Sequence, residues 1–338
     1  MIITAKNTYP VISLLILSMW IIFVTILHGQ SDSGLISVMR LIFEQVLGVV
    51  VFTVLKPTVK SCVIFLVGLG LINSIIIMIS VFDKVLLNNS LGVGTFFEAF
   101  WGIHEDPTRS AGIFPSYQSS GLYLLLTLYL LNKYSLINRE LKTFISLFLV
   151  FSLLFGSRFY LVFALLLFLV NSMKFISTKS LAVIVIGSSL LWLQLSDNKL
   201  VEYHVNKRIA PIMNSLVNGD YSSDASVVDM VNNEWVLPID EKTIILGNGG
   251  AKYSEIGGGD TLFFRWLYFG GFPAVILIYF VVVAKAYYLF GRPRDLDSII
   301  IWLAILAGTL KSESFISTGF FLILCLWPIK NTDVKNVH

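Results

Sequence analysis

Long apolar runs, separated by short polar segments, follow one another along the whole chain. Apolar and polar residues do not alternate with a period of two inside these runs, so they do not read as strands of a membrane barrel. Many approach the ~20 residues that an α-helix needs to cross a bilayer. We therefore predict an all-α chain with about ten transmembrane helices. Their expected positions are 10–27, 35–55, 62–82, 118–131, 141–155, 159–173, 181–195, 261–284, 296–310 and 314–329.

The composition agrees with a membrane protein and excludes an ordinary soluble one. Of the 338 residues, 56% are hydrophobic and 13% are charged, whereas soluble domains have roughly 45–50% and about 25%. We expect a single transmembrane domain over residues 1–338. The net charge of +3 is too small and too spread out to indicate a nucleic-acid partner. Cys62 and Cys325 lie in apolar runs, where packed thiols are expected rather than a disulfide or metal framework.

Basic residues predict how the helices are oriented. They gather in every second short connection and in the C-terminal tail, which is the positive-inside pattern of membrane proteins. If these connections face the cytoplasm, both termini are cytoplasmic as well. The residues that set this orientation are Lys56, Lys60, Lys133, Arg139, Lys142, Lys174, Lys179, Lys285, Arg292, Arg294, Lys330 and Lys335.

Two long loops are expected on the opposite, outer side, at about 83–117 and 196–260. Long connections without regular structure are uncommon unless they serve a function. Residues 91–101 of the first loop are rich in aromatic side chains and predict a short interfacial helix. The second loop is expected to open with an amphipathic helix that ends near Gly219.

Cations on the outer side oppose the positive-inside pattern and point to candidate chemistry. Arg158 lies in a turn between apolar helices, Arg265 lies several residues into an apolar run, and Lys311 follows an apolar helix. An ionisable group at membrane depth is costly unless it is paired or hydrated, which makes it a candidate for function. Snorkelling to the interface is the alternative for each. For Lys84, Lys199, Lys242 and Lys252, we expect solvated loop charges.

Outward-facing cations at a membrane surface predict an anionic ligand, and a membrane-embedded pyrophosphate fits them. Guanidinium groups match phosphate oxygens with two parallel hydrogen bonds, and a lysine adds a point charge. If the pyrophosphate is a leaving group, the same residues stabilise the charge that develops on it. These residues predict an anion site but not, by themselves, a reaction.

Four segments resemble the Wzy-type O-antigen polymerase family, which is related to O-antigen ligases. Residues 109–116 (RSAGIFPS) resemble an outer-loop stretch of the family, and 156–158 (GSR) resemble its Gly-Ser-Arg turn. Residues 246–250 (LGNGG) are similar to a segment late in its large loop. Residues 260–271, from Asp260 to the two glycines, are similar to its closing motif. The resemblance covers most of residues 105–329.

The resemblance implies an integral-membrane glycosyltransferase of the C type in the bacterial inner membrane. Such enzymes transfer a growing glycan from undecaprenyl pyrophosphate onto an incoming lipid-linked repeat unit, at the periplasmic face. Flippase and chain-length regulator proteins of the same pathway are the implied protein partners. No cofactor and no metal are expected, and the chain has no clustered histidines.

For glycosyl transfer of this kind, position in the chain and charge suggest roles for particular residues. Asp260, Arg158 and Arg265 are the expected catalytic residues, with Asp260 as the base that takes the proton of the acceptor hydroxyl. Asp260 as a helix N-cap is the alternative, and Asp224 is the second candidate for the base. The pyrophosphate would be bound by Arg109, Arg208 and Lys311. His204 is a further candidate, although a structural or surface histidine is the favoured interpretation.

The chain departs from the family at two places. Asp224-Ala225-Ser226 is not followed by the arginine often found there, and Arg208 is the candidate to replace it. Ligase relatives have a histidine where this chain has Asp260, which favours a polymerase over a ligase. A transporter or flippase is the strongest rival reading, supported by Arg40 and Glu44 within one predicted span. A structural scaffold would leave the two long outer loops unexplained.

Overall fold

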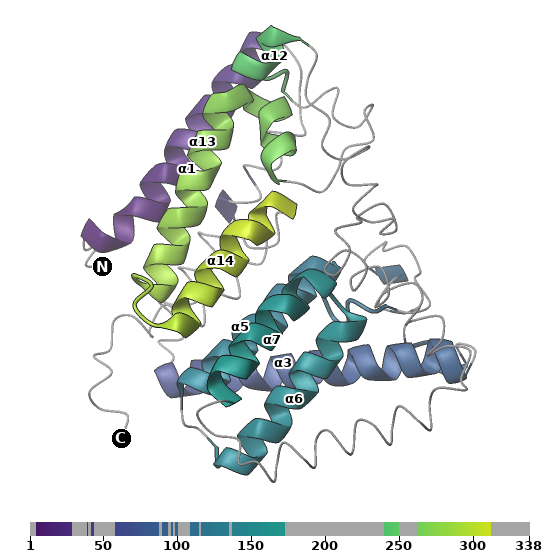
Figure 1. Ribbon diagram of the computed structural model, residues 1–338. Helices are drawn as coiled ribbons and strands as arrows, with labels where there is room; N and C mark the ends of the chain where they lie inside the picture. Colours follow the sequence, from purple (N-terminus) through teal and green to yellow (C-terminus); the bar gives the residue numbers. More distant parts are fainter. Residues whose placement is uncertain are drawn as a thin grey trace, which may run out of the picture.

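The computed structural model describes residues 5–28, 39, 42–43, 58–87, 90–93, 96, 99–100, 109–114, 116–134, 137–172, 240–249 and 262–311. Every regular element in these ranges is an α-helix, which confirms the all-α prediction for this part of the chain. The helices are α1 (Ala5–His28), α3 (Val59–Leu86), α5 (Tyr117–Lys133), α6 (Arg139–Phe155), α7 (Arg158–Ser172), α12 (Glu241–Leu246), α13 (Leu262–Phe290) and α14 (Leu296–Lys311) (Figure 1).

The helices follow the predicted spans, with different ends. Spans 35–55, 181–195 and 314–329 lie largely or wholly outside the described residues, as does most of the loop 196–260. Helix α3 continues to Leu86, so Asp83 belongs to a helix rather than to the first outer loop. Within the predicted interfacial segment, Val93, Phe96 and Phe100 are helical, and Phe96 and Phe100 are exposed.

Polar side chains set the starts of these apolar helices. The first backbone N–H groups of a helix lack partners within it, and a side-chain oxygen just before the helix can accept one of them. Ser116 accepts from Ser119 N at 3.0 Å and so begins α5. Asn138 accepts from Leu141 N at 3.0 Å and begins α6. Asp295 accepts from Ser298 N at 2.7 Å ahead of α14.

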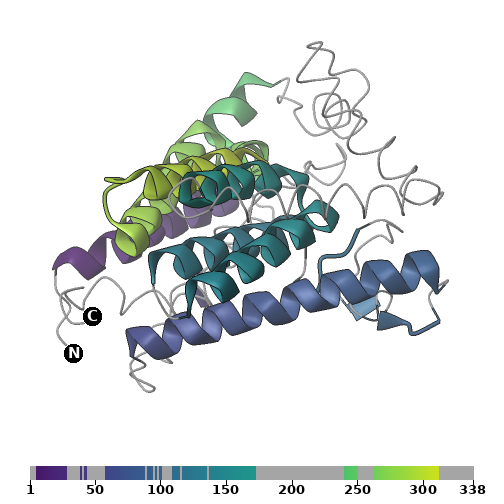
Figure 2. The ribbon, with the colours of Figure 1, turned by 60° about the horizontal axis from the view of Figure 1, so that its bottom comes forward.

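The helices form two groups that pack together through α14. One group contains α3, α5, α6 and α7, and the other contains α1, α12, α13 and α14 (Figures 1 and 2). Helix α14 contacts α7 and α5 across the boundary. At one point of this contact, a Cβ on Gly308 would collide with the hydroxyl of Tyr160. Only a glycine lets α14 and α7 approach so closely.

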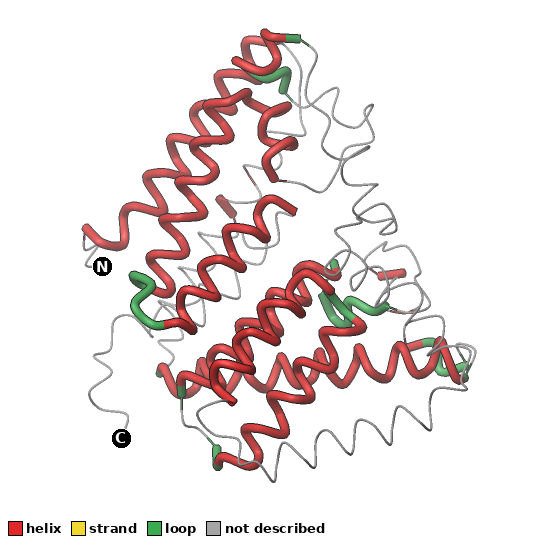
Figure 3. The backbone as a smooth tube through the Cα atoms, in the orientation of Figure 1, coloured by secondary structure: helices red, strands yellow, loops and turns green. Residues whose placement is uncertain are grey.

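Helices that follow one another in the chain, such as α5, α6 and α7, run in opposite directions, so the chain reverses at two ends of the bundle (the backbone is drawn in Figure 3). At one end, Arg109, Ser110 and Gln118 meet the α6–α7 turn, and Gly308 meets the first turn of α7. At the other end, Asn171 of α7 donates to Asp297 of α14 at 3.2 Å, and Lys142 donates to the carbonyl of Asn132 at 2.9 Å. We call these the motif end and the turn end.

Two helical stretches in the described residues, Lys60–Lys84 and Phe263–Tyr287, are long and apolar enough to cross a membrane. Shorter apolar helices are Leu15–His28, Arg158–Asn171 and Leu296–Leu310. Outward-facing apolar side chains accompany them: Met19 and Ile26 of α1 are 70% and 74% exposed. Large exposed apolar surfaces are costly in water and mark sites that contact lipid or protein. This surface agrees with a membrane protein, and the number of about ten spans remains a prediction.

Candidate functional site

The segment that begins at Arg109 packs directly on the turn before Arg158. The backbone N–H of Ser110 donates to the carbonyl of Phe155 at 3.1 Å, and Nε of Arg109 donates to the carbonyl of Gly156 at 3.3 Å. These carbonyls belong to the end of α6, where a helix leaves acceptors without intrahelical partners. Two segments that resemble separate family motifs are therefore joined by hydrogen bonds at the motif end.

Asn73, in the middle of the apolar helix α3, binds the Arg109 segment through hydrogen bonds. Its side chain is fully buried, and Oδ1 accepts from the backbone N–H of Ile113 at 2.9 Å. Its Nδ2 donates to Oγ of Ser120 on α5, also at 2.9 Å. Gly112 has φ +61° and lies so close that a Cβ there would collide with Asn73 Oδ1. One amide thus ties the loop to two helices, a role that the sequence analysis did not identify.

The end of α3 fastens the same loop by its charged groups. Nζ of Lys84 donates to the carbonyl of Arg109 at 3.1 Å, so the prediction of a solvated loop charge is wrong for this lysine. The carboxylate of Asp83 is buried and accepts from the backbone N–H groups of Leu91 and Val93, at 2.8 and 3.2 Å. Burial of a carboxylate is costly without such donors. These contacts position the backbone on both sides of residues 94–108.

The guanidinium of Arg109 lies on an aromatic ring. Its Cζ is 4.0 Å from the ring centroid of Tyr117, the first residue of α5, which is a cation–π contact. The side chain is half-buried. Stacking on the ring fixes the plane of the guanidinium, and a guanidinium is the side-chain group that pairs with an oxyanion through two parallel hydrogen bonds.

Arg158 is the first residue of α7, and the turn before it is fixed on α5. Oγ of Ser157 donates to Oε1 of Gln118 at 2.9 Å. Gly121 permits this contact, since a Cβ there would collide with the side chain of Ser157. Arg158 is half-buried, and the positive end of the α7 dipole adds to its charge. The structure therefore places Arg109 and Arg158 in contacting segments of the motif end.

The two later motif segments also pair with each other. The backbone N–H groups of Asn248 and Gly249 donate to the carbonyls of Tyr268 and Phe269, at 2.9 and 3.2 Å. Within α13, the carbonyl of Phe269 would pair with the N–H of residue 273, but Pro273 has none. This carbonyl instead accepts from the segment that follows α12.

A kink in α13 makes this pairing possible. Gly270 and Gly271 have non-helical backbone angles, and Gly271 has φ +67°. A Cβ on Gly271 would collide with the carbonyl of Ile245 in α12, and Gly247, with φ +75°, approaches Gly270 equally closely. Nε1 of Trp20 in α1 donates to the carbonyl of Gly270 at 2.7 Å. The predicted span 261–284 did not include this kink.

Arg265 lies on the short part of α13 before the kink. Its guanidinium carbon is 5.4 Å from the ring centroid of Phe269, one helical turn later, and the side chain is half-buried. Lys311 is the last residue of α14. Asp260, Asp224, His204 and Arg208 lie outside the described residues. Among the residues that are described, no group of three His, Cys, Asp or Glu side chains is placed to hold a metal ion.

Comparison with known proteins adds no relative. No family model, no curated protein and no solved structure matches this chain.

Proposed function

We propose that this chain is a glycosyltransferase that polymerises oligosaccharide repeat units carried on undecaprenyl pyrophosphate. The observation that carries the proposal is the junction of residues 109–114 with the α6–α7 turn, which gathers two arginines at one end of apolar helices. A lipid-linked pyrophosphate combines an anion with a long apolar chain. That chemistry suits cations fixed where helices with exposed apolar faces end.

In the proposed reaction, a hydroxyl of the acceptor sugar attacks the anomeric carbon of the donor glycan. The bond from this carbon to the pyrophosphate oxygen breaks as the new glycosidic bond forms, and the electron pair leaves with undecaprenyl pyrophosphate. The hydroxyl proton passes to a carboxylate, for which Asp260 is the first candidate and Asp224 the second. No oxidant, nucleotide or other co-reactant enters this balance.

The arginines take the part that a divalent cation takes in nucleotide-sugar enzymes. Arg109 and Arg158 bind the pyrophosphate, and Arg265 stabilises its charge as it leaves. Arg208 and Lys311 are further donors in the proposal. Purified protein supplied with lipid-linked repeat units should therefore form polymer in excess EDTA, detected by gel electrophoresis of the glycan. Loss of polymer with EDTA and its return with magnesium would contradict this assignment.

The deletion strain gives the decisive test of the function. If the chain is a polymerase, the strain makes surface glycan of single repeat units on the usual acceptor, and wild-type protein restores the ladder. If no repeat unit at all is attached to this acceptor, the chain is a ligase or a flippase instead. Accumulation of lipid-linked units inside the cytoplasmic leaflet then separates a flippase from a ligase.

A further inference from the structure

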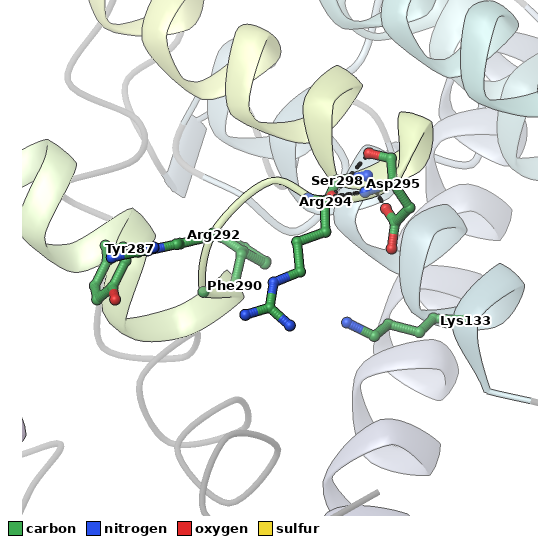
Figure 4. A pocket seen from close by; sticks show the side chains of 8 residues that line it. Lys133, Tyr287, Phe290, Arg292, Arg294, Asp295 and Ser298 are labelled. Carbon is green, nitrogen blue, oxygen red and sulfur yellow. Dashed lines mark hydrogen bonds between the residues drawn. The ribbon is translucent and has the colours of Figure 1, made fainter.

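A second site lies at the turn end of the bundle, away from the motif segments. A cavity of about 580 Å³ opens between the end of α5 and the α13–α14 turn. Its lining consists of Lys133, Tyr287, Phe290, Gly291, Arg292, Arg294, Asp295 and Ser298 (Figure 4). The proposed glycosyl transfer uses none of these residues.

The turn that carries the two arginines is held by its own backbone. Gly291 has φ +74° and closes α13 by donating from its N–H to the carbonyl of Tyr287 at 2.9 Å. Oγ of Ser298 accepts from the backbone N–H of Arg294 at 3.1 Å. Pro293 separates the arginines and fixes its own φ. The arginine side chains therefore project from a backbone whose shape is set before any ligand binds.

Positive charge dominates the cavity. Lys133, Arg292 and Arg294 are exposed, and Asp295 is the acidic residue of the lining. Oδ1 of Asp295 accepts from Ser298 N at 2.7 Å and so serves as the cap of α14. In Figure 4, the cationic ends of Arg294 and Lys133 point into the same space from opposite sides. Like charges directed at one space repel each other, and an anion between them relieves the repulsion.

An apolar path leads to the cavity along α13. Five large side chains of this helix are exposed at intervals of three or four residues, so they share one face. They are Phe272, Ile276, Phe280, Val283 and Tyr287. Tyr287 is both the last of these residues and part of the cavity lining. A molecule with an anionic head and a hydrocarbon tail would match the cavity and the helix face together, whereas a free anion would use only the cavity.

We propose that the turn-end cavity binds the phosphate headgroup of an anionic phospholipid, with an acyl chain lying along the exposed face of α13. The guanidinium group of Arg294 and the ammonium of Lys133 hold the phosphate oxygens, and Arg292, whose side chain extends towards Tyr287, adds positive charge to the same lining (Figure 4). The turn carries residues of the positive-inside pattern, so the lipid belongs to the cytoplasmic leaflet. This site is independent of the proposed polymerase activity, and its test needs no activity.

Lipid titration followed by native mass spectrometry tests the proposal on the full chain purified in detergent. The probes are phosphatidylglycerol, which is anionic, and phosphatidylcholine, which is zwitterionic. We expect tighter binding of phosphatidylglycerol, and about a fivefold weakening for each cation removed in Arg292→Gln/Arg294→Gln. Arg139→Gln is the matched control, because Arg139 is exposed near the turn end on α6 but does not line the cavity. It should bind phosphatidylglycerol as the wild type does.

A second variant and a second probe separate a lipid from a free anion. Phe280→Asn should weaken phosphatidylglycerol binding without affecting inorganic phosphate, because Phe280 lies on the apolar path and outside the cavity lining. Inorganic phosphate should compete only weakly with the lipid. Equal binding of the two lipids, or unchanged lipid binding in the double arginine variant, would overturn the proposal. Phosphate that binds as tightly as the lipid would assign the cavity to a soluble anion instead.

Discussion

At the scale of single residues, the motif end depends on polar side chains of α3 whose role the apolar pattern does not predict. Asn73 lies within a predicted span and Lys84 just beyond its predicted end, yet both bind the backbone of the Arg109 segment. The sequence could indicate Arg109 and Arg158 as unusual cations because they oppose the charge pattern. It could not indicate Asn73, since its partners are 40 and 47 positions away. Only the packing of α3 against α5 brings them together.

Replacement of Arg158 tests the proposed anion site. Arg158→Ala should lower kcat about 10²–10³-fold with normal protein abundance, because a lost donor to the leaving group acts in the transition state. Arg158→Lys should recover little, since an ammonium cannot reproduce the paired hydrogen bonds of a guanidinium. Polymerisation of purified lipid-linked units is the assay. Lys242→Ala, at an exposed position in α12, is the control and should retain activity; full-length polymer from Arg158→Ala would remove this arginine from the mechanism.

Replacement of Asn73 tests how the loop is held. Asn73→Ala leaves the N–H of Ile113 without its acceptor and should destabilise the protein by about 1–3 kcal/mol. Thermal unfolding in detergent measures the loss. Thr143→Ala removes an exposed hydroxyl that binds the carbonyl of Arg139, and its unfolding temperature should stay near that of the wild type. Equal unfolding temperatures for Asn73→Ala and Thr143→Ala would show that the amide does not anchor the loop.

At the scale of elements, apolar runs predicted helices well because a helix satisfies its backbone within the run. The kink of α13 was missed for the same reason: apolar content does not reveal where a helix breaks. Gly270, Gly271 and Pro273 were the available signal, but their consequence depends on the segment after α12, whose backbone N–H groups donate to the carbonyls of Tyr268 and Phe269. Helix α12 is short and polar at its start, so the apolar pattern did not predict it.

Two glycine variants test the kink. Gly271→Ala should lower the free energy of unfolding by about 1–3 kcal/mol, because Gly271 has a backbone conformation that is essentially limited to glycine, and by more because its Cβ meets the carbonyl of Ile245. Gly68→Ala is the matched control, since nothing lies within 4 Å of a Cβ at this helical position. It should be neutral or should gain about 0.5–1 kcal/mol. Thermal unfolding compares the two variants. If Gly271→Ala unfolds at the same temperature as Gly68→Ala, the packing of α12 does not depend on the kink.

At the scale of the whole molecule, the two ends of the helical bundle carry two kinds of chemistry. The motif end carries Arg109 and Arg158, and the turn end carries the cavity with Arg292 and Arg294. Charge counting along the sequence predicted that these groups face opposite sides of a membrane. It could not predict that basic residues of the turn end would form a cavity, because α5 and the α13–α14 turn are far apart in the sequence.

Cysteine labelling tests the orientation. In a variant whose Cys62 and Cys325 are replaced by serine, Lys242→Cys should react with an impermeant maleimide in intact spheroplasts. Arg292→Cys should react only after the inner membrane is permeabilised. Both positions are exposed, so a difference in labelling reports the side of the membrane rather than burial. The reverse pattern would invert the proposed topology.

The contact between Gly308 and Tyr160 has a mechanical consequence. The tyrosine is buried in the first turn of α7, two residues after Arg158, and its hydroxyl fills the notch left by the missing side chain of the glycine. A side chain inserted between two helices resists sliding of one helix along the other but permits rotation about the contact. Any movement of α7 relative to α14 would therefore be a rotation about a point near Tyr160. Such a rotation would displace Arg158 very little, because Arg158 is two residues away from this point.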